Sequence, residues 1–148
     1  MQIIFSYSSR NDIINSNLVK KGQSVEILIK TVFEYTAGSY LSFASEEING
    51  DNFVTFNIDG TITINEDIEC LIFANISGAT YKNRAWIKLV NYSNGDVYSE
   101  NIQYGAYVTC CLATKLQLTK GDKIGVYTTE DFQLNWGGLI SNIIFIRL

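Results

Sequence analysis

The chain has 148 residues, of which 47% are hydrophobic and 18% are charged, and its formal net charge at pH 7 is −4. This length and composition are typical of one folded domain that buries a sizeable core, and they argue against a disordered chain. The lysines and arginines are scattered rather than clustered. Because binding to nucleic acid requires clustered positive charge, we expect no nucleic-acid partner.

The sequence carries neither a membrane-spanning nor an export pattern. No apolar segment reaches the roughly 18 residues needed to cross a bilayer. Met1–Arg10 lack the basic region and apolar core of a secretory signal. We therefore expect neither membrane insertion nor a signal peptide.

The three cysteines are an odd set, which is not typical of a disulfide framework. Cys110 and Cys111 are adjacent, so on a strand they would face opposite ways. We favour small buried thiols in a reducing compartment over metal or redox use.

Period-two alternation dominates the first half of the chain, and helical periodicity is weak. Asn11–Lys20 carries a short apolar pattern that allows a helix. After Gln23 we expect strands, with Asp59-Gly60 as a hairpin signal. The strands expected in this half are Val25–Tyr35, Tyr40–Ala44, Phe53–Ile58 and Thr61–Ile64.

An acidic and amide-rich segment, Glu46–Asn52, separates two of these strands. Its oxygen atoms could hold Ca²⁺, but it lacks the ordered ligand alternation of an EF-hand loop. A polar surface loop is the favoured interpretation, and we predict no metal and no cofactor.

The second half contains the longest apolar segments. Ile68–Ile76 is nearly all apolar, which predicts a strand buried on both faces. About nine or ten short strands, spaced by about ten residues, indicate a β-sandwich or barrel. The strands expected after Ile76 are Ala85–Tyr92, Val97–Asn101, Ala106–Leu118, Ile124–Thr129 and Leu139–Leu148.

The segment Leu116–Tyr127 joins two of these strands through a tight turn, Lys120-Gly121-Asp122. Gly121 supplies a positive φ and Asp122 hydrogen-bonds to the local backbone. We therefore expect Ile124–Thr129 to be the hairpin partner of Ala106–Leu118.

Several segments of residues 50–148 follow one another in the order of a known family. Leu116–Ile124 carries a Leu-x-Leu-x-x-Gly-Asp pattern, and Ser141 stands in a closing apolar strand. With these features the chain resembles the C1q/TNF-like jelly-roll superfamily. It departs from that family where the closing phenylalanines and glycine are lost and where the buried strand reads Ile68-Glu69-Cys70-Leu71-Ile72. The other matching segments are Gly60–Ile64, Ile68–Phe73, Trp86–Asn91 and Ile140–Ile144.

The resemblance implies an all-β jelly-roll sandwich that forms a homotrimer through one sheet face. The domain is expected over residues 31–148. Residues 1–30 fit the family core less well, and they would be a peripheral strand or a docking arm that attaches to other virion proteins.

One strand face is neither clearly polar nor clearly core, and such a face often marks a subunit interface. It carries Tyr107, Thr109 and Cys111. We predict that these residues and Tyr127 lie in the trimer interface.

The residue types give little support for catalysis. The chain has no histidine, which removes the commonest general base and metal ligand. Paired carboxylates could still act on a glycosidic bond. Most acidic residues are expected in turns, so we predict no catalytic residues and no enzyme activity.

Aromatic residues make up 13% of the chain. Exposed tyrosine and tryptophan stack well on sugar rings and partner proteins, although some of them would simply cover the sandwich ends or pack at the trimer axis. The candidate ligand-binding aromatics are Tyr81, Trp86, Tyr92, Tyr98, Tyr104 and Trp136.

The resemblance, the asparagine- and isoleucine-rich composition and the absence of an export signal together favour a bacteriophage structural protein. We expect a non-enzymatic head- or tail-fibre or decoration trimer in the virion, assembled in the host cytoplasm. Its partners would be host cell-surface glycan or protein. A bacterial surface or spore-coat adhesion module and a carbohydrate-active enzyme on a β-sandwich are the alternatives.

Overall fold

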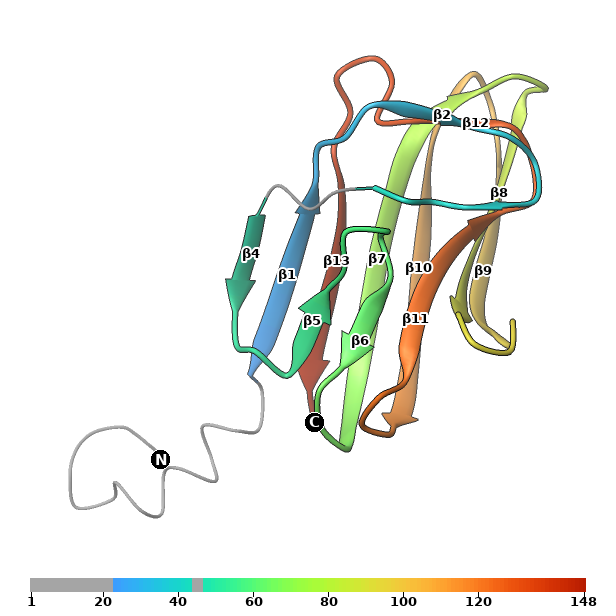
Figure 1. Ribbon diagram of the computed structural model, residues 1–148. Helices are drawn as coiled ribbons and strands as arrows, with labels where there is room; N and C mark the ends of the chain where they lie inside the picture. Colours follow the sequence, from blue (N-terminus) through green and yellow to red (C-terminus); the bar gives the residue numbers. More distant parts are fainter. Residues whose placement is uncertain (1–22, 44–46) are drawn as a thin grey trace, which may run out of the picture.

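The computed structural model describes residues 23–43 and 47–148, with the side chains of residues 47–49 left aside (Figure 1). The described residues form thirteen β-strands in two antiparallel sheets, and they include no helix. The all-β sandwich expected from the sequence is therefore confirmed. The three strands beyond those expected are short ones of three or four residues. The predicted helix at Asn11–Lys20 lies outside the described residues.

Sheet A has seven strands, with the long strand β7 near its centre. One edge of β7 pairs with β10 along its whole length, and the other edge pairs with β13 and then with β12. The strands of sheet A are β2 (Phe33–Tyr35), β12 (Phe132–Leu134), β7 (Ile68–Thr80), β13 (Ser141–Arg147), β1 (Ser24–Ile29), β4 (Glu47–Gly50) and β10 (Tyr107–Leu118).

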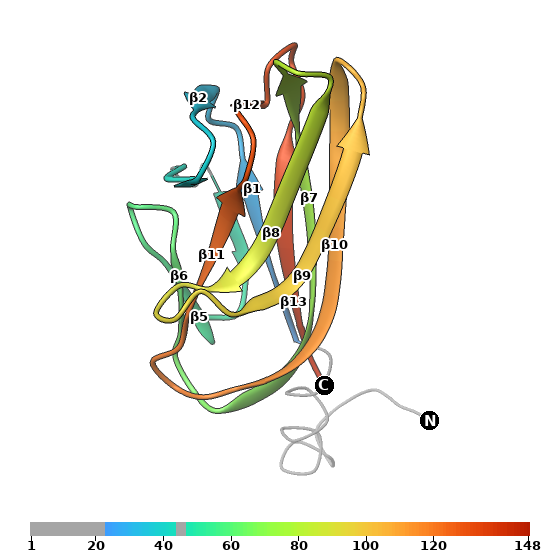
Figure 2. The same ribbon diagram turned by 90° about the vertical axis from the view of Figure 1, so that its right-hand side faces the viewer.

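Sheet B has six strands and lies over sheet A, as the view toward the edge of β9 and β10 shows (Figure 2). Its centre is β11, which pairs with β8 on one edge and with β6 and β3 on the other. The strands of sheet B are β5 (Val54–Phe56), β6 (Ile62–Ile64), β11 (Lys123–Thr128), β8 (Arg84–Asn91), β9 (Val97–Tyr104) and β3 (Ser39–Tyr40).

The core fills the space between the two sheets with one side chain from every second strand position. On β8 these are Ala85, Ile87 and Leu89, all fully buried. Complete burial of such a side chain contributes about 1.5–3 kcal/mol. Other large, fully buried side chains are Ile27, Ile29, Leu41, Phe43, Ile62, Ile64, Ile72, Ile76, Phe132 and Phe145.

Strand β1 belongs to the body of the sandwich. It pairs with β13 on one edge and with β4 on the other, and Val25, Ile27 and Ile29 are fully buried. Ser24–Ile29 is thus an integral strand, although the sequence analysis placed it in the segment 1–30. The docking role proposed for that segment concerns residues that lie mostly outside the described ones.

The acidic segment Glu46–Asn52 is not a loop, because Glu47–Gly50 forms the edge strand β4. The pairing brings the backbones very close. A Cβ at Gly50, where φ is +111°, would lie 1.9 Å from the carbonyl oxygen of Ser24. Glycine at this position therefore allows the polar segment to pair with β1. The polar side chains of the segment had predicted a loop. The predicted strand Val25–Tyr35 is likewise divided, into β1 and β2.

The predicted hairpin between Ala106–Leu118 and Ile124–Thr129 is wrong. β10 pairs with β7 in sheet A, whereas β11 pairs with strands of sheet B. The turn itself forms, with Gly121 at φ +95° and the Thr119 amide donating to Asp122 Oδ2 at 2.9 Å. It carries the chain from one sheet to the other. The predicted Asp59-Gly60 hairpin between β5 and β6 is present.

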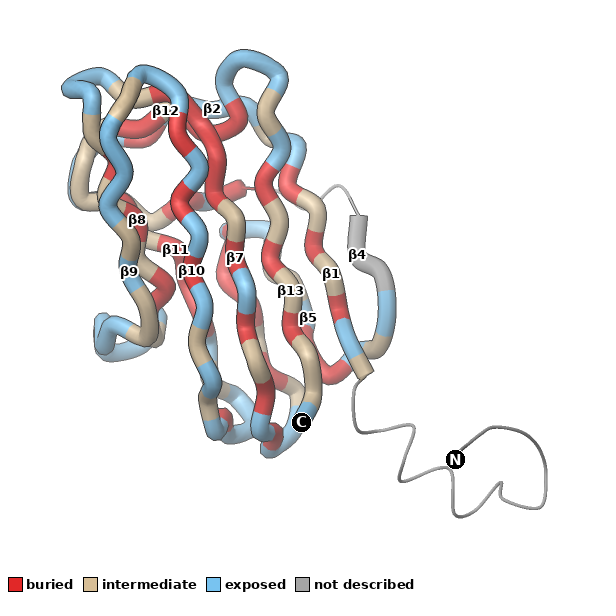
Figure 3. The backbone as a smooth tube through the Cα atoms, turned by 180° about the vertical axis from the view of Figure 1, so that it is seen from behind, coloured by how far each residue is buried: buried red, intermediate tan, exposed pale blue. Residues whose placement is uncertain are grey.

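Strand β7 is not buried on both faces. Its inner residues Cys70, Ile72 and Ala74 are fully buried, whereas Leu71 and Phe73 on the other face are partly exposed. Figure 3 shows this alternation along β7, β10 and β13. The apolar run in the sequence therefore covers two different surfaces, one core and one outward.

Candidate interaction surfaces

The outer face of sheet A carries an apolar band that crosses three strands. Ala113 of β10 pairs with Phe73 of β7, which pairs with Ile144 of β13. In the next row Leu71 pairs with Ile146. These five residues, the sheet A band, point away from the core, and Phe73 keeps 38% of its surface exposed. An antiparallel sheet face that meets water normally carries polar residues at such positions.

Polar pairs border the sheet A band on two sides. Asn75 Nδ2 donates to Asn142 Oδ1 at 2.9 Å, and Asn142 Nδ2 donates to Glu26 Oε2 at 3.1 Å. On the opposite side Lys115 Nζ lies 3.5 Å from Glu69 Oε2. An apolar centre with a polar rim is the usual pattern of a protein interface.

Three of the predicted interface residues lie on this face of β10. Tyr107, Thr109 and Cys111 are exposed, and Cys111 pairs with Asn75 beside the sheet A band. Tyr127 lies on the outer face of sheet B, where it pairs with Tyr40 and Lys88. The first three predicted residues therefore share the outer face of sheet A, and Tyr127 lies on the outer face of the other sheet.

The three cysteines differ sharply in their surroundings. Burial raises the pKa of the Cys70 thiol to about 11 and that of the Cys110 thiol to about 11. Cys111 is exposed on the opposite face of β10 from Cys110. The opposite orientation of the vicinal pair, predicted from the sequence, is thus present. All three are free thiols.

The outer face of sheet B carries a group of aromatic rings. The Tyr40 ring centroid lies 4.7 Å from that of Tyr92 and 5.2 Å from that of Tyr127. Both Tyr40 and Tyr92 pack over Gly125, where a Cβ would lie 3.1 Å from a ring carbon of each. Trp86 continues this surface on β8, and its indole N–H donates to Glu100 Oε1 at 2.7 Å.

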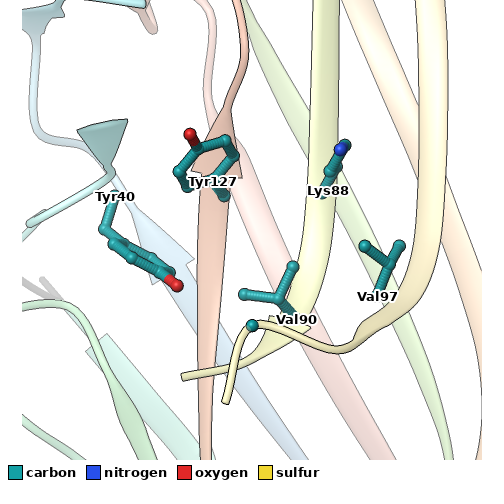
Figure 4. A pocket seen from close by; sticks show the side chains of 6 residues that line it. Tyr40, Lys88, Val90, Val97 and Tyr127 are labelled. Carbon is teal, nitrogen blue, oxygen red and sulfur yellow. The ribbon is translucent and has the colours of Figure 1, made fainter. Parts of the chain in front are cut away.

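A hollow of about 290 Å³ opens beside these rings (Figure 4). Tyr40 and Tyr127 lie on one side of it, and Val97 and Lys88 on the other. Val90, which is almost fully buried, and the turn residue Gly95 complete the lining. The sequence analysis singled out neither Tyr40 nor Lys88 as a site residue, because only the pairing of β3 and β8 with β11 brings them together.

A second aromatic group lies at the loop end of the sandwich, where β12 leads into β13 at the top of Figure 1. Trp136 is 41% exposed there. Beside it the Tyr107 ring lies 2.8 Å from where a Cβ on Gly137 would be. Other exposed apolar side chains in the loops and strand ends of the chain are Val32, Phe33, Tyr81, Tyr104 and Ile140.

A buried polar network holds the base of the Trp136 loop. Asn135 is fully buried at φ +56°, and its Nδ2 donates to the carbonyls of Ile29 at 2.6 Å and Thr31 at 3.0 Å. Its Oδ1 accepts from the Ser141 hydroxyl at 2.6 Å. The Ser141 oxygen in turn accepts from the Ser77 amide at 2.9 Å. Every polar atom of the Asn135 side chain is therefore satisfied.

The six candidate aromatics do not form one site. Tyr81, Tyr104 and Trp136 are exposed, and Trp86 and Tyr92 belong to the outer face of sheet B. Tyr98 packs against the core. Burial raises the pKa of Tyr98, whose hydroxyl accepts from Asn91 Nδ2 at 3.0 Å. This residue therefore supports the sandwich from inside.

The candidate carboxylates are spread over separate turns and pairs. Asp59 accepts from the Thr61 hydroxyl at 2.6 Å, and this bond lowers the pKa of Asp59. Asp67 accepts from the Lys120 amide, and Asp131 from the Ala37 amide, both at 2.8–2.9 Å. Within the described ranges no three acidic or cysteine side chains gather as a metal-binding group. These contacts are those of turn-stabilising acids.

Comparison with known proteins supports the fold alone. No protein-family model and no curated protein sequence matches the chain. Among solved structures, the Eiger TNF of S. frugiperda superposes with a TM-score of 0.69 at 14% identity, over 86% of this chain and 94% of that one. The chain has the TNF/C1q-like jelly-roll fold.

Two further solved structures with this jelly roll also superpose on the chain. Murine APRIL gives a TM-score of 0.65 at 12% identity, over 86% of this chain and all of that one. The globular domain of a zebrafish complement 1qA protein gives 0.60 at 11% identity, over 83% of this chain and 94% of that one. The resemblance that the Leu116–Ile124 pattern suggested is confirmed at the level of the fold. Within the described residues no helix is long and apolar enough to span a membrane.

Proposed function

We propose that the protein is a non-enzymatic homotrimeric binding module, assembled through the outer face of sheet A. The sheet A band carries this proposal, because no element among the described residues covers its apolar side chains. Proteins with the TNF/C1q-like fold form homotrimers, which supports self-association as the way the band is covered. A closed threefold assembly would also protect edge strands such as β10.

The module has two functional ends in this proposal. β1 starts at the lower end of the sandwich in Figure 1, so the segment before it joins the domain there. The loop with Trp136 lies at the opposite end. A docking arm at one end and exposed aromatics at the other suit a protein that is anchored to a particle and presents a binding surface outward.

We assign this module to a bacteriophage virion, as a head- or tail-fibre or decoration component that binds the host cell envelope. The fold and the asparagine- and isoleucine-rich composition support the assignment. A bacterial surface or spore-coat adhesion module would use the same surfaces. Gene neighbourhood separates the two, because capsid and tail genes accompany the first and coat genes the second.

Adsorption to host cells tests the proposal. We expect the purified trimer to bind cells of the host or its isolated envelope, and we expect Trp136→Ala and Tyr81→Ala to weaken that binding. Ile58→Ala is the matched control, since Ile58 is 92% exposed in the turn between β5 and β6. A monomeric protein that binds neither cells nor envelope would contradict the proposal.

A further inference from the structure

The hollow beside Tyr40 and Tyr127 is a surface separate from the sheet A band. It lies on the outer face of sheet B, on the other side of the molecule from the sheet A band. Trimerisation through sheet A therefore leaves it open to solvent. We propose that this hollow binds a single pyranose ring that carries a carboxylate, an inference that rests on the proposed binding function and names its ligand class.

The shape of the hollow comes from the residues on two neighbouring strands. Gly125 of β11 has no side chain, and Val90 opposite it is almost fully buried, so both form a low floor. Tyr40 and Tyr127 rise on one side, and Val97 rises on the other. At about 290 Å³ the space is near the lower limit of the roughly 300–1,000 Å³ typical of small-molecule sites, which suits one sugar ring.

The walls match the two faces of a sugar. Aromatic ring faces carry a negative potential, which attracts the polarised C–H groups on one side of a pyranose. Tyr40 and Tyr127 meet at 74° with centroids 5.2 Å apart, so they form an angled aromatic wall. The methyl groups of Val97 offer a second apolar contact across the hollow.

Polar groups without partners converge on the same space. In the described part of the chain, the hydroxyls of Tyr40 and Tyr127 form no hydrogen bond, and Lys88 forms no ion pair. A few converging polar groups on a largely apolar lining are the usual arrangement of a ligand site. The Tyr40 phenol can donate to or accept from sugar hydroxyls.

Lys88 selects the carboxylate. Its Nζ lies 4.9 Å from the centroid of the Trp86 ring, so a cation–π contact orients the ammonium group. The cross-strand neighbour Glu100 is the obvious ion-pair partner, but its Oε1 instead accepts from the Trp86 indole at 2.7 Å. Among the described residues Lys88 therefore has no carboxylate partner, and it can form a charge-assisted hydrogen bond with an acidic sugar.

Packing alone explains only part of this arrangement. Tyr40 and Tyr92 cover Gly125, which accounts for those two rings. It does not account for the ammonium of Lys88, which lies beside the open space.

Titration of the ¹⁵N-labelled full chain with sodium glucuronate, sodium N-acetylneuraminate and glucose tests the site by chemical-shift changes. We expect at least one acidic sugar to give saturable shifts at the amides of Gly95, Val97 and Gly125, with glucose binding more weakly. Lys88→Gln should weaken the acidic sugar about tenfold or more, the loss of one charge-assisted hydrogen bond, and leave glucose unchanged. Tyr40→Phe keeps the ring and should weaken both sugars. Ile58→Ala, in the exposed turn between β5 and β6, should change neither.

The proposal is overturned if neither acidic sugar shifts these amides, or if Lys88→Gln binds them as tightly as the unaltered protein. Failure of the site is distinguishable from failure of the proposed function. A trimer that adsorbs to host cells but shows no sugar-induced shifts keeps its function and lacks this site. A monomer that does not adsorb to cells but shows the saturable shifts keeps the site and lacks the proposed function.

Discussion

Phe73 of β7 lies directly across from Ile144 of β13, and both side chains point away from the core. The pair forms the centre of the sheet A band. No described residue covers these two large apolar side chains in the middle of an outward sheet face, and a second molecule packed on them would bury their surface. This relationship connects the fold to the proposed trimer.

The reactivity of Cys111 should report that trimer. The thiolate is the reactive form of cysteine, and the raised pKa of about 11 for Cys70 and Cys110, together with their burial, keeps both thiols unreactive at pH 8. We expect N-ethylmaleimide to label Cys111 slowly in the assembled protein and at least tenfold faster in Phe73→Glu, as measured by intact mass. Equal labelling rates in the two proteins would place Cys111 outside the interface.

Asn135 should be the most costly asparagine to replace at a positive φ. Asn135→Ala removes three side-chain hydrogen bonds, two of them buried, and strains the backbone, so we expect a loss of about 3 kcal/mol or more in the free energy of unfolding.

Asn83 is the matched control for Asn135. It has nearly the same φ, +59° against +56°, but it is exposed. Asn83→Ala should cost only the backbone strain, about 1 kcal/mol. Urea unfolding of both variants measures the difference, and equal costs would show that the buried network contributes nothing.

The buried thiols predict an alkaline limit of stability. Burial raises the pKa of Cys70 and of Cys110 from 9.0 to about 11, so the folded state retains protons that the unfolded state releases. The stabilisation is complete below pH 9 and is lost as the pH rises toward 11. Cys110→Ala should make the free energy of unfolding fall less steeply between pH 9 and pH 11 than it does in the unaltered chain. Denaturant titrations at each pH measure this free energy. If it falls equally steeply with pH in Cys110→Ala and in the unaltered chain, the assignment is contradicted.

Gly78 should resist substitution because of close packing rather than φ. A Cβ there would lie 2.2 Å from the carbonyl oxygen of Gln133 on β12. We expect Gly78→Ala to separate β7 from β12 and to lower the midpoint of thermal unfolding by several degrees. Gly138 has φ +79° with open space around it, so Gly138→Ala measures only the cost of placing a side chain at a positive φ. Gly78→Ala without any loss of stability would show that the two strands can move apart freely.

Local pattern predicted the strands well and their partners poorly. The alternation in β10 and β11 is visible in the sequence, but which sheet each strand joins depends on pairing with β7 and β8, far away along the chain. The Gly-Asp turn looks the same whether it closes a hairpin or crosses between sheets. For the same reason the apolar sequence of Ile68–Ile76 fits two cases equally well. Such a strand can be buried on both faces, or it can have one buried face and one apolar face that points outward.

The interaction surfaces show the same limit. Tyr107, Thr109 and Cys111 could be chosen from one strand, because residues at every second position share a face. The hollow on sheet B could not, since Tyr40 and Lys88 come together only when β3 and β8 pair with opposite edges of β11. Likewise Tyr98 turns inward at a register shift between β8 and β9, which no aromatic count reveals.

The mass of the protein in solution tests the central claim most directly. Light scattering on the purified chain at micromolar concentration should give three times the 16.6 kDa of one chain. Phe73→Glu and Ile144→Lys should each shift the mass to that of one folded chain, whereas Ile58→Glu should leave the trimer intact. A single-chain mass for the unaltered protein, or a trimer that survives both substitutions in the sheet A band, would contradict the account.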